Sequence, residues 1–205
     1  MILSVESSFL AGSIPRTEDA GRARKTPGAG AGRRRTRRFG WGGAMGKGVI
    51  VRSNCRWCGE ATFEHVPTSG AAFVSDAPLM GEEPRALRGP TPMEMLLGAL
   101  CGCSGADLVG IFEKMRLKIR TLTMEVEGER GEEHPRIFRE IVISYRIETD
   151  PPDAAKALRA VELSMHKYCA VSATLASAGR VRYRLSSAGE EFEGEVPVGG
   201  EQAPS

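Results

Sequence analysis

Cysteine is the residue type in this 205-residue sequence with the greatest capacity for covalent chemistry. A small secreted domain held together by disulfides would normally pair all of its cysteines, and an odd number cannot be paired completely within one molecule. The odd count here therefore predicts thiols kept in a reducing compartment, and so a cytoplasmic protein. The cysteines are Cys55, Cys58, Cys101, Cys103 and Cys169.

Cys103 and Cys169 form a candidate pair for redox chemistry. Cys103 lies in a segment that is apolar from Met93 onward apart from Glu94, and Cys169 ends a second segment with helical periodicity. If the two helices pack together, one thiol from each can meet. A thiolate that attacks a peroxide becomes a sulfenic acid, which condenses with a second thiol to a disulfide. The pair therefore predicts a thiol-dependent peroxidase.

Cys101 competes with Cys103 for this role. Residues two apart on a helix point about 200° away from each other, so only one of the two can face Cys169 directly. The residue pattern alone does not choose between them. His166 precedes Cys169 by three positions and could tune its thiol. Against any catalytic role stands the fact that a buried cysteine is more often an inert small hydrophobe.

Cys55 and Cys58 form a CxxC motif to which we assign no catalytic role. A redox CxxC normally precedes a helix, whereas a strand pattern follows this one. A zinc site would need two further ligands at suitable spacing, and the sequence does not supply them, so no metal is expected. An accessory disulfide between the two cysteines is a weaker alternative.

The expected elements give the fold class. The element order is three strands, a helix, two strands, a helical region and two strands, which is α+β rather than alternating βαβ. Without a glycine-rich phosphate loop after a strand, nucleotide binding has no support. Strands are expected at 49–52, 60–66, 71–76, 117–127, 137–147, 180–185 and 191–196. Helices are expected at 92–116, with Thr91 as N-cap, at 151–168 and at 171–178.

Charge is distributed unevenly along the chain. Residues 1–44 contain nine of the 28 basic residues and only three of the 26 acidic ones. We expect 1–44 to be a disordered basic extension that results from a start site assigned upstream of Met45, 45–196 to be the folded domain, and 197–205 to be a disordered tail. The acidic balance of the folded part gives no argument for nucleic acid, and without 18 consecutive apolar residues no membrane span is expected.

Two motifs carry a resemblance to the OsmC/Ohr family, nearest to its OsmC-like branch. Thr91 to Val109, TPMEMLLGALCGCSGADLV, resembles the helix of that family that bears the first cysteine. Lys167 to Leu175, KYCAVSATL, is similar to its second-cysteine motif. The resemblance extends over about residues 47–185, which is nearly the whole foldable part.

The resemblance implies an OsmC-like fold, with two core helices wrapped by antiparallel sheets in an intertwined homodimer whose active sites lie at the subunit interface. It implies Cys103 as the peroxidatic and Cys169 as the resolving cysteine, and so decides against Cys101. The implied activity is reduction of organic hydroperoxides in oxidative-stress defence. The implied reductant is a dithiol such as a lipoyl protein, with no cofactor.

The sequence departs from the family pattern at the residues that activate the thiol. The best-studied members have an acidic residue directly after the proline that opens the helix, and this residue holds an arginine beside the thiolate. Met93 occupies that position here, and Glu94 follows one residue later, about 100° around the helix. Glu94 and Arg56 are the candidates for thiolate support, with Arg88 as another source of the cation. Because a buried thiol without a nearby cation stays protonated, a non-catalytic redox sensor or small-molecule-binding protein is the alternative.

Overall fold

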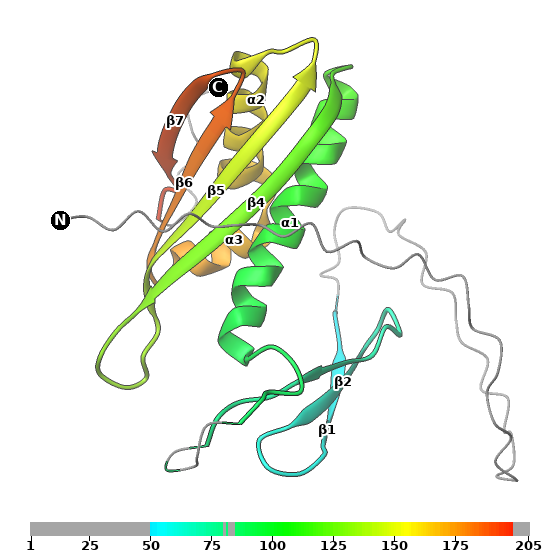
Figure 1. Ribbon diagram of the computed structural model, residues 1–205, viewed down its shortest axis with the longest axis vertical. Coiled ribbons are helices and arrows are strands. Elements are labelled where there is room, and N and C mark those ends of the chain that lie inside the picture. The colour runs from blue at the N-terminus through cyan, green and yellow to red at the C-terminus, as the bar shows by residue number, and fades with distance from the viewer. Residues whose placement is uncertain (1–49, 80, 82–84, 199–205) are drawn as a thin grey trace, which may run out of the picture. The chain divides into compact units, whose positions relative to one another are not determined.

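The computed structural model describes residues 50–79, 81 and 85–198, all within one compact unit that begins at Ile50 (Figure 1). Our expectation for 1–44 lies outside these residues, and so does all of the expected tail 197–205 except its first two residues. The α+β class is confirmed. The elements are β1 (Ser53–Trp57), β2 (Phe63–Pro67), β3 (Phe73–Ser75), α1 (Pro92–Lys114), β4 (Lys118–Arg130), β5 (Phe138–Asp150), α2 (Ala154–Leu163), η1 (Ser164–Tyr168), α3 (Ala170–Ala176), β6 (Arg180–Ser187) and β7 (Glu190–Glu195).

β1, β2 and β3 form a small antiparallel sheet. The strand expected at 49–52 is wrong, because β1 begins only at Ser53 and runs through the CxxC segment to Trp57. The register places Cys55 opposite His65 and Arg56 opposite Glu64. Successive side chains of a strand point to opposite faces, so these two cross-strand pairs lie on opposite faces of the sheet.

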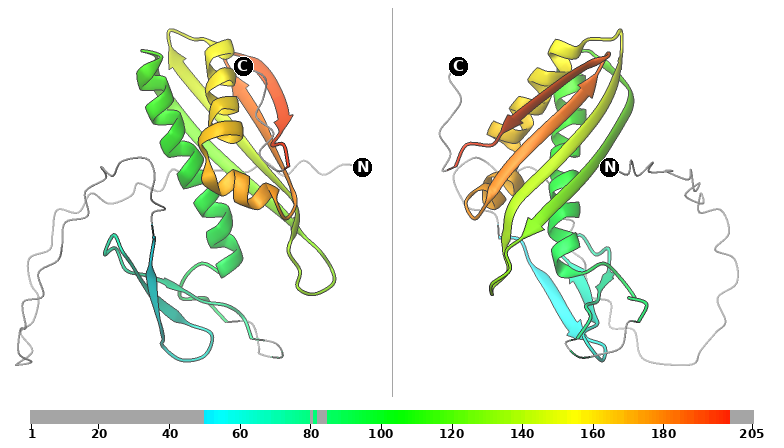
Figure 2. Two further views of the ribbon diagram at one scale, coloured as in Figure 1. Left: turned by 180° about the vertical axis from the view of Figure 1, so that it is seen from behind. Right: turned by 60° about the vertical axis from the view of Figure 1, so that its left-hand side comes forward.

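The larger sheet has the strand order β4-β5-β6-β7, and one of its pairings corrects the expectation of antiparallel sheets. β4–β5 and β6–β7 are antiparallel, but β5 and β6 are parallel. A parallel pair needs a crossover connection, which α2, η1 and α3 supply. Figure 2 shows the helices together on one face of this sheet.

The hydrophobic core lies between this sheet and its helices. β5 alternates, with Ile141, Ile143, Tyr145 and Ile147 all buried, as the period-two pattern predicted. Each fully buried aliphatic side chain contributes about 1.5–3 kcal/mol relative to an exposed one. The helices contribute fully or almost fully buried side chains to the same cluster, among them Leu100, Leu108, Phe112, Val161 and Met165.

α1 begins and ends at residues with clear local causes. Thr91 and Glu94 form a capping box, and Pro92 occupies the first turn, where its missing N–H costs nothing. The helix stops at Lys114, two residues short of the expected end, because Arg116 has a left-handed φ of 54°.

By length and composition α1 could cross a membrane, although no spanning segment was expected. The core helix of a soluble protein meets the same criterion, and α1 packs on β4, α2, η1 and α3. The length of this apolar helix is therefore weak evidence for a membrane.

Candidate active site

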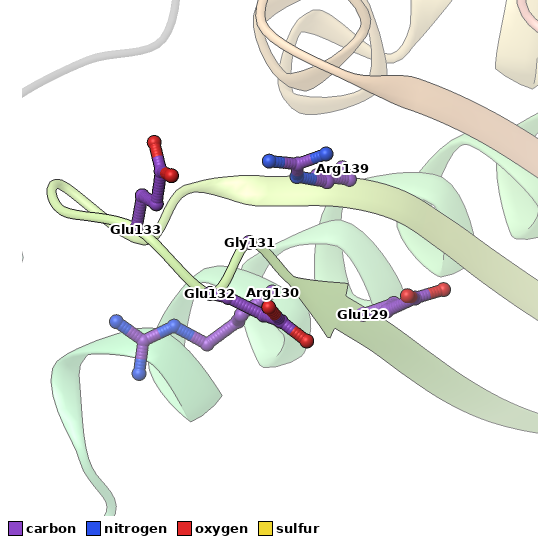
Figure 3. A pocket seen from close by; sticks show the side chains of 6 residues that line it. All are labelled: Glu129, Arg130, Gly131, Glu132, Glu133 and Arg139. Carbon is purple, nitrogen blue, oxygen red and sulfur yellow. The ribbon is translucent and has the colours of Figure 1, made fainter.

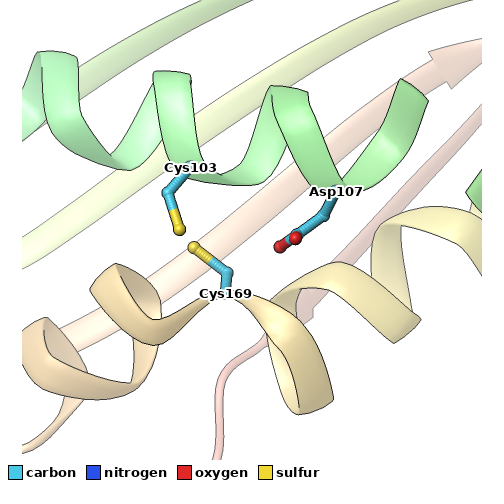
Figure 4. A group of neighbouring side chains, drawn as sticks. All are labelled: Cys103, Asp107 and Cys169. Atoms are coloured by element: carbon cyan, nitrogen blue, oxygen red, sulfur yellow. The ribbon is translucent and has the colours of Figure 1, made fainter. Parts of the chain in front are cut away.

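Three side chains from different parts of the helical layer converge on one point (Figure 4). They are Cys103 and Asp107 from α1 and Cys169 from the junction of η1 and α3, and their sulfur and carboxylate oxygen atoms lie within 4.8 Å of one another. Both cysteines are free thiols. Cys101 is not part of this group. The structure thus brings together the two cysteines that the sequence analysis paired.

A π-helical turn positions Cys169. The sequence analysis expected a regular helix as far as Tyr168, but α2 ends at Leu163 and Ser164–Tyr168 form the wider turn η1. The Cys169 N–H donates to the Ser164 carbonyl at 2.8 Å, five residues back, and Cys169 itself is extended. The chain then starts α3 with Cys169 as N-cap. Because the helix is broken here, the Cys169 sulfur points toward α1 (Figure 4).

Ser172 fixes the bend between η1 and α3. Its buried hydroxyl lies 2.9 Å from the Met165 carbonyl oxygen and 2.8 Å from the Cys169 carbonyl oxygen. Its backbone N–H donates to the Cys169 sulfur at 3.4 Å. The hydrogen bonds of Ser172 to Met165 and to Cys169 therefore help to hold the Cys169 sulfur in position.

Asp107 is the residue of the cluster to which the sequence analysis gave no role. It follows Cys103 by four positions on α1, so the two side chains share a face of the helix. The Ser164 hydroxyl donates to its Oδ2 at 3.2 Å. Burial raises the pKa of Asp107, and this hydrogen bond partly opposes the rise. An acidic residue one turn after a cysteine, in an otherwise apolar segment, is the signal that could have found it.

A buried polar network stands behind the cluster. The Ser104 and Tyr145 hydroxyls are hydrogen-bonded, and the Tyr145 hydroxyl donates to the Met165 sulfur at 3.1 Å. The Ser164 hydroxyl lies 3.3 Å from that of Ser104. Burial raises the pKa of Tyr145, which keeps its phenol neutral. Because such networks rigidify a core when every member has a partner, this one couples α1, β5 and η1 around the thiols.

Burial also governs the thiol chemistry. Burial is the main reason why the pKa of Cys169 is raised to about 11; the hydrogen bond from the Ser172 N–H opposes this rise, and the contact with the Cys103 thiol adds to it. Burial likewise raises the pKa of Cys101. Near neutral pH, Cys169 is therefore a protonated thiol.

The candidates for thiolate support have other partners within this chain. Glu94 Oε2 accepts a hydrogen bond from the Thr91 N–H at 2.7 Å, and Glu94 precedes Cys103 by nine positions on the helix, about 13.5 Å along the axis. The Arg56 guanidinium pairs with Glu64 at 2.8 Å. Neither contacts the thiol pair within one chain, and their supporting role stays a prediction that a second subunit would have to fulfil.

The remaining candidates lie apart from the pair as well. The His166 Nε2 is 3.1 Å from the Glu195 carbonyl oxygen, and its ring packs against Tyr183. The Arg88 guanidinium is 3.9 Å from Glu60.

The CxxC cysteines are not joined. Cys55 and Cys58 are exposed free thiols, so the accessory disulfide is not formed in this structure. Residues three apart in an extended segment are separated by about 10 Å, which exceeds the roughly 7 Å limit for a disulfide. Within the described ranges, the one group of three or more metal-ligand side chains is Cys103, Asp107 and Cys169, so Cys55 and Cys58 belong to no such group.

The Cys103, Asp107 and Cys169 group offers sulfur and oxygen donors of the kind that zinc accepts, but it has three ligands where structural zinc sites have four. Zinc binding would also require the Cys169 thiol to lose its proton, and the raised pKa of Cys169 disfavours this loss.

Two surface pockets lie away from the thiols. The first, of about 190 Å³, is formed at the β4–β5 hairpin by Glu129, Arg130, Gly131, Glu132, Glu133 and Arg139, whose charges are mixed in sign (Figure 3). The second, of about 400 Å³, lies at the opposite end of the same hairpin and includes Arg120, Arg146 and Gly189. Neither provides a substrate cavity at Cys103.

Known proteins are similar to this chain in sequence and fold. The family model for OsmC-like protein matches residues 83–184, which include Cys103, Asp107 and Cys169. Protein YhfA of Escherichia coli strain K12 is 34% identical over 134 residues, 65% of this chain and 95% of that protein. A hypothetical protein from Aquifex aeolicus VF5 has a TM-score of 0.58 at 26% identity, covering 67% of this chain and 96% of its own. An OsmC-like protein from Mycoplasma pneumoniae also has a TM-score of 0.58, at 16% identity and with the same coverages.

Proposed function

This chain belongs to the family of OsmC-like proteins, and from that premise we propose that it reduces organic hydroperoxides with Cys103 and Cys169. The observation that carries the proposal is the approach of two free thiols and a carboxyl group to within 4.8 Å of one another. A nucleophile, a resolving thiol and a proton carrier are the three groups that this chemistry needs. The resemblance to the family supplies the substrate class.

The first step oxidises Cys103. Its thiolate attacks the terminal oxygen of the hydroperoxide, the O–O bond breaks, and Cys103 becomes a sulfenic acid while an alkoxide leaves. The proton that the Cys103 thiol lost is the proton that the alkoxide needs to become an alcohol. Atoms and electrons therefore balance as thiol plus hydroperoxide giving sulfenic acid plus alcohol.

Asp107 is placed to carry that proton. It lies on the same helical face as Cys103, and Ser164 holds its carboxyl group. A raised pKa brings a carboxyl group closer to the neutral range in which it can both accept and return a proton. We assign to Asp107 the proton transfer that accompanies attack, in a site where Met93 replaces the acidic residue of the family.

The second step forms a disulfide. Cys169 attacks the sulfenic sulfur of Cys103, and water leaves. An external dithiol, such as that of a lipoyl protein, then reduces the disulfide and restores both thiols. The sum is hydroperoxide plus dithiol giving alcohol, water and the oxidised dithiol, so no metal or organic cofactor enters. The reaction suits a cytoplasmic role in oxidative-stress defence.

A homodimer is part of the proposal. Along α1 the exposed side chains Ala99, Gly102, Ala106 and Val109 recur at intervals of three and four residues. Residues at this spacing form a stripe along one face of α1, and their small size allows a second helix to approach closely. A partner subunit packed there would cover Val109, which is 54% exposed in one chain. It could also bring a cation to the thiols, since Arg56 and Arg88 pair with Glu64 and Glu60 within one chain.

Hydroperoxide consumption tests the assignment. The measurement is turnover of cumene hydroperoxide with dihydrolipoamide as reductant. We expect Cys103→Ser to abolish turnover, and Cys169→Ser to accumulate a sulfenic acid that a dimedone probe traps at residue 103. Cys101→Ser is the matched control, because it removes a half-buried thiol of the same helix outside the cluster. Full turnover by Cys103→Ser would refute the proposal.

A second candidate function rests on the environment of the thiols. Cys169 is protonated near neutral pH, and neither Arg56 nor Glu94 reaches the pair within one chain. These facts favour a non-catalytic redox sensor or small-molecule-binding protein of the same fold. Such a protein would form the Cys103–Cys169 disulfide with excess peroxide but would not turn over with dihydrolipoamide.

A further inference from the structure

On the small sheet formed by β1, β2 and β3, the Cys55 thiol belongs to a row of hydrogen-bonded side chains. The Cys55 sulfur is 2.9 Å from His65 Nδ1, and His65 Nε2 is 2.7 Å from the Ser75 hydroxyl oxygen. Each of the three strands contributes one member. The register places Cys55 directly opposite His65, so the pairing of the strands itself fixes the contact.

The His65 imidazole is held in place by two further side chains. Its ring stacks on Phe73, with ring centroids 4.7 Å apart and an interplanar angle of 6°. Ser75 is buried, and its hydroxyl is hydrogen-bonded to Nε2, the imidazole nitrogen farther from the thiol. A nucleophile within hydrogen-bond distance of a base, with the base oriented by a third group, is the arrangement that activates nucleophiles in enzymes. The Cys55 thiol, at one end of this row of hydrogen-bonded side chains, is exposed.

We propose that Cys55 is a second nucleophilic thiol, independent of Cys103 and Cys169, which undergoes exchange with low-molecular-weight disulfides. The Cys55 thiol transfers its proton to His65 Nδ1, and its sulfur attacks one sulfur of the small disulfide. The S–S bond of that molecule breaks, a mixed disulfide forms on Cys55, and the thiolate that leaves takes the proton from the imidazolium. One external thiol is released for each Cys55 modified, and no other oxidant is required.

Cys58 does not resolve this mixed disulfide. In the extended segment its Cα lies about 10 Å from that of Cys55, outside the range of a disulfide. Its sulfur instead donates to the Arg56 carbonyl at 3.5 Å. The modification of Cys55 therefore persists until an external thiol removes it.

Cys58 provides a matched control within the same molecule. Both thiols are exposed and three residues apart, but only Cys55 contacts an imidazole. Trypsin cuts after Arg52 and Arg56, so the two cysteines fall on different peptides. A short exposure of the intact wild-type protein to oxidised glutathione, followed by alkylation, digestion and mass spectrometry, gives both rates in one experiment.

We expect the glutathione adduct to form on Cys55 at least tenfold faster than on Cys58 near neutral pH. His65→Ala should remove this difference, and added imidazole should restore part of it, which a purely structural role of His65 would not allow. Ser75→Ala should lower the Cys55 rate and Ser75→Thr should retain it. Equal rates at Cys55 and Cys58 in the wild-type protein would overturn the proposal whatever the variants do. Hydroperoxide turnover plays no part in this readout, so the two proposals can fail separately.

Discussion

At the scale of single residues, burial sets the protonation of the groups that face Cys103. It raises the pKa of Cys169 and of Asp107 alike, which favours the neutral form of both side chains. A raised pKa in the folded state means that the group destabilises the fold once the pH is high enough to ionise it. Ionisation of Cys169 or Asp107, which the proposed reaction uses, therefore lowers the stability of the fold.

Asp107→Asn separates these two effects. We expect hydroperoxide turnover to fall by about 100-fold, because proton transfer by a positioned acid or base contributes at least that much. The midpoint of urea unfolding near neutral pH should stay the same or rise, since the amide keeps the contact with Ser164 without a charge to bury. The control is Glu113→Gln, which changes an exposed acid on the same helix and should alter neither quantity. Unchanged turnover in Asp107→Asn would rule out its role in proton transfer.

The rate of disulfide formation should depend steeply on pH. Because the pKa of Cys169 is about 11, its thiolate fraction should grow about tenfold for each pH unit between neutral and about pH 10. Rapid-mixing measurements of sulfenic acid decay after one equivalent of peroxide would follow this rise. The raised pKa also implies that folding stability falls as the pH increases from about 9 toward about 11. A decay rate that is flat across this range would show that Cys169 is not the resolving thiol.

Residue types and the family resemblance together predicted which two thiols meet, but not what surrounds them. Cys103 and Cys169 were paired because each lies in a segment of helical periodicity, and the choice against Cys101 came only from the family resemblance. Asp107 was overlooked because reading the helix as an apolar run draws attention away from its one half-buried acid. The partners of Arg56 and Glu94 depend on strand register and on helix capping, which spacing does not specify.

At the scale of elements, the connection from η1 to α3 determines where the Cys169 sulfur lies. The sequence predicted two helical pieces here, and α2 and α3 correspond to them. It could not predict the π turn, because the five residues of η1 are too few for the wider period of a π turn to show in the apolar pattern. The parallel pairing of β5 and β6 was missed for a related reason, since alternation shows that a strand has a buried face but not which way its neighbour runs.

Ser172→Ala should destabilise the protein by about 1–3 kcal/mol, because it removes the hydroxyl that donates to the buried Met165 carbonyl; the Cys169 carbonyl keeps its hydrogen bond from the Ala173 N–H. Thr174→Ala is a matched control in the same helix: its hydroxyl also donates to a backbone carbonyl, that of Ala170, but at the surface. That change should cost less than about 0.5 kcal/mol. Urea unfolding of both variants checks the difference, and equal losses would contradict the account of the bend.

At the scale of the whole molecule, the stripe on α1 is the surface that a second subunit would cover. Ala106→Arg should convert a dimer of about twice the 22.1 kDa chain mass into a monomer, because the long charged side chain prevents close approach of two helices. Ala155→Arg, an exposed alanine of α2, should leave the dimer intact. Light scattering after gel filtration measures both masses. A dimer that survives Ala106→Arg would place the interface elsewhere.

The way the large sheet is completed affects the chain while it is being synthesised. β4 and β5 can pair as soon as their hairpin is made, but β6 pairs with β5 only after the whole connection that carries Cys169 has been translated and has docked. A nascent chain that ends near residue 150 therefore carries Cys103 without Cys169. Oxidant reaching the protein at that stage would meet Cys103 without its resolving thiol, so we expect ribosome-bound intermediates to be more prone to irreversible sulfinic acid damage than the finished fold.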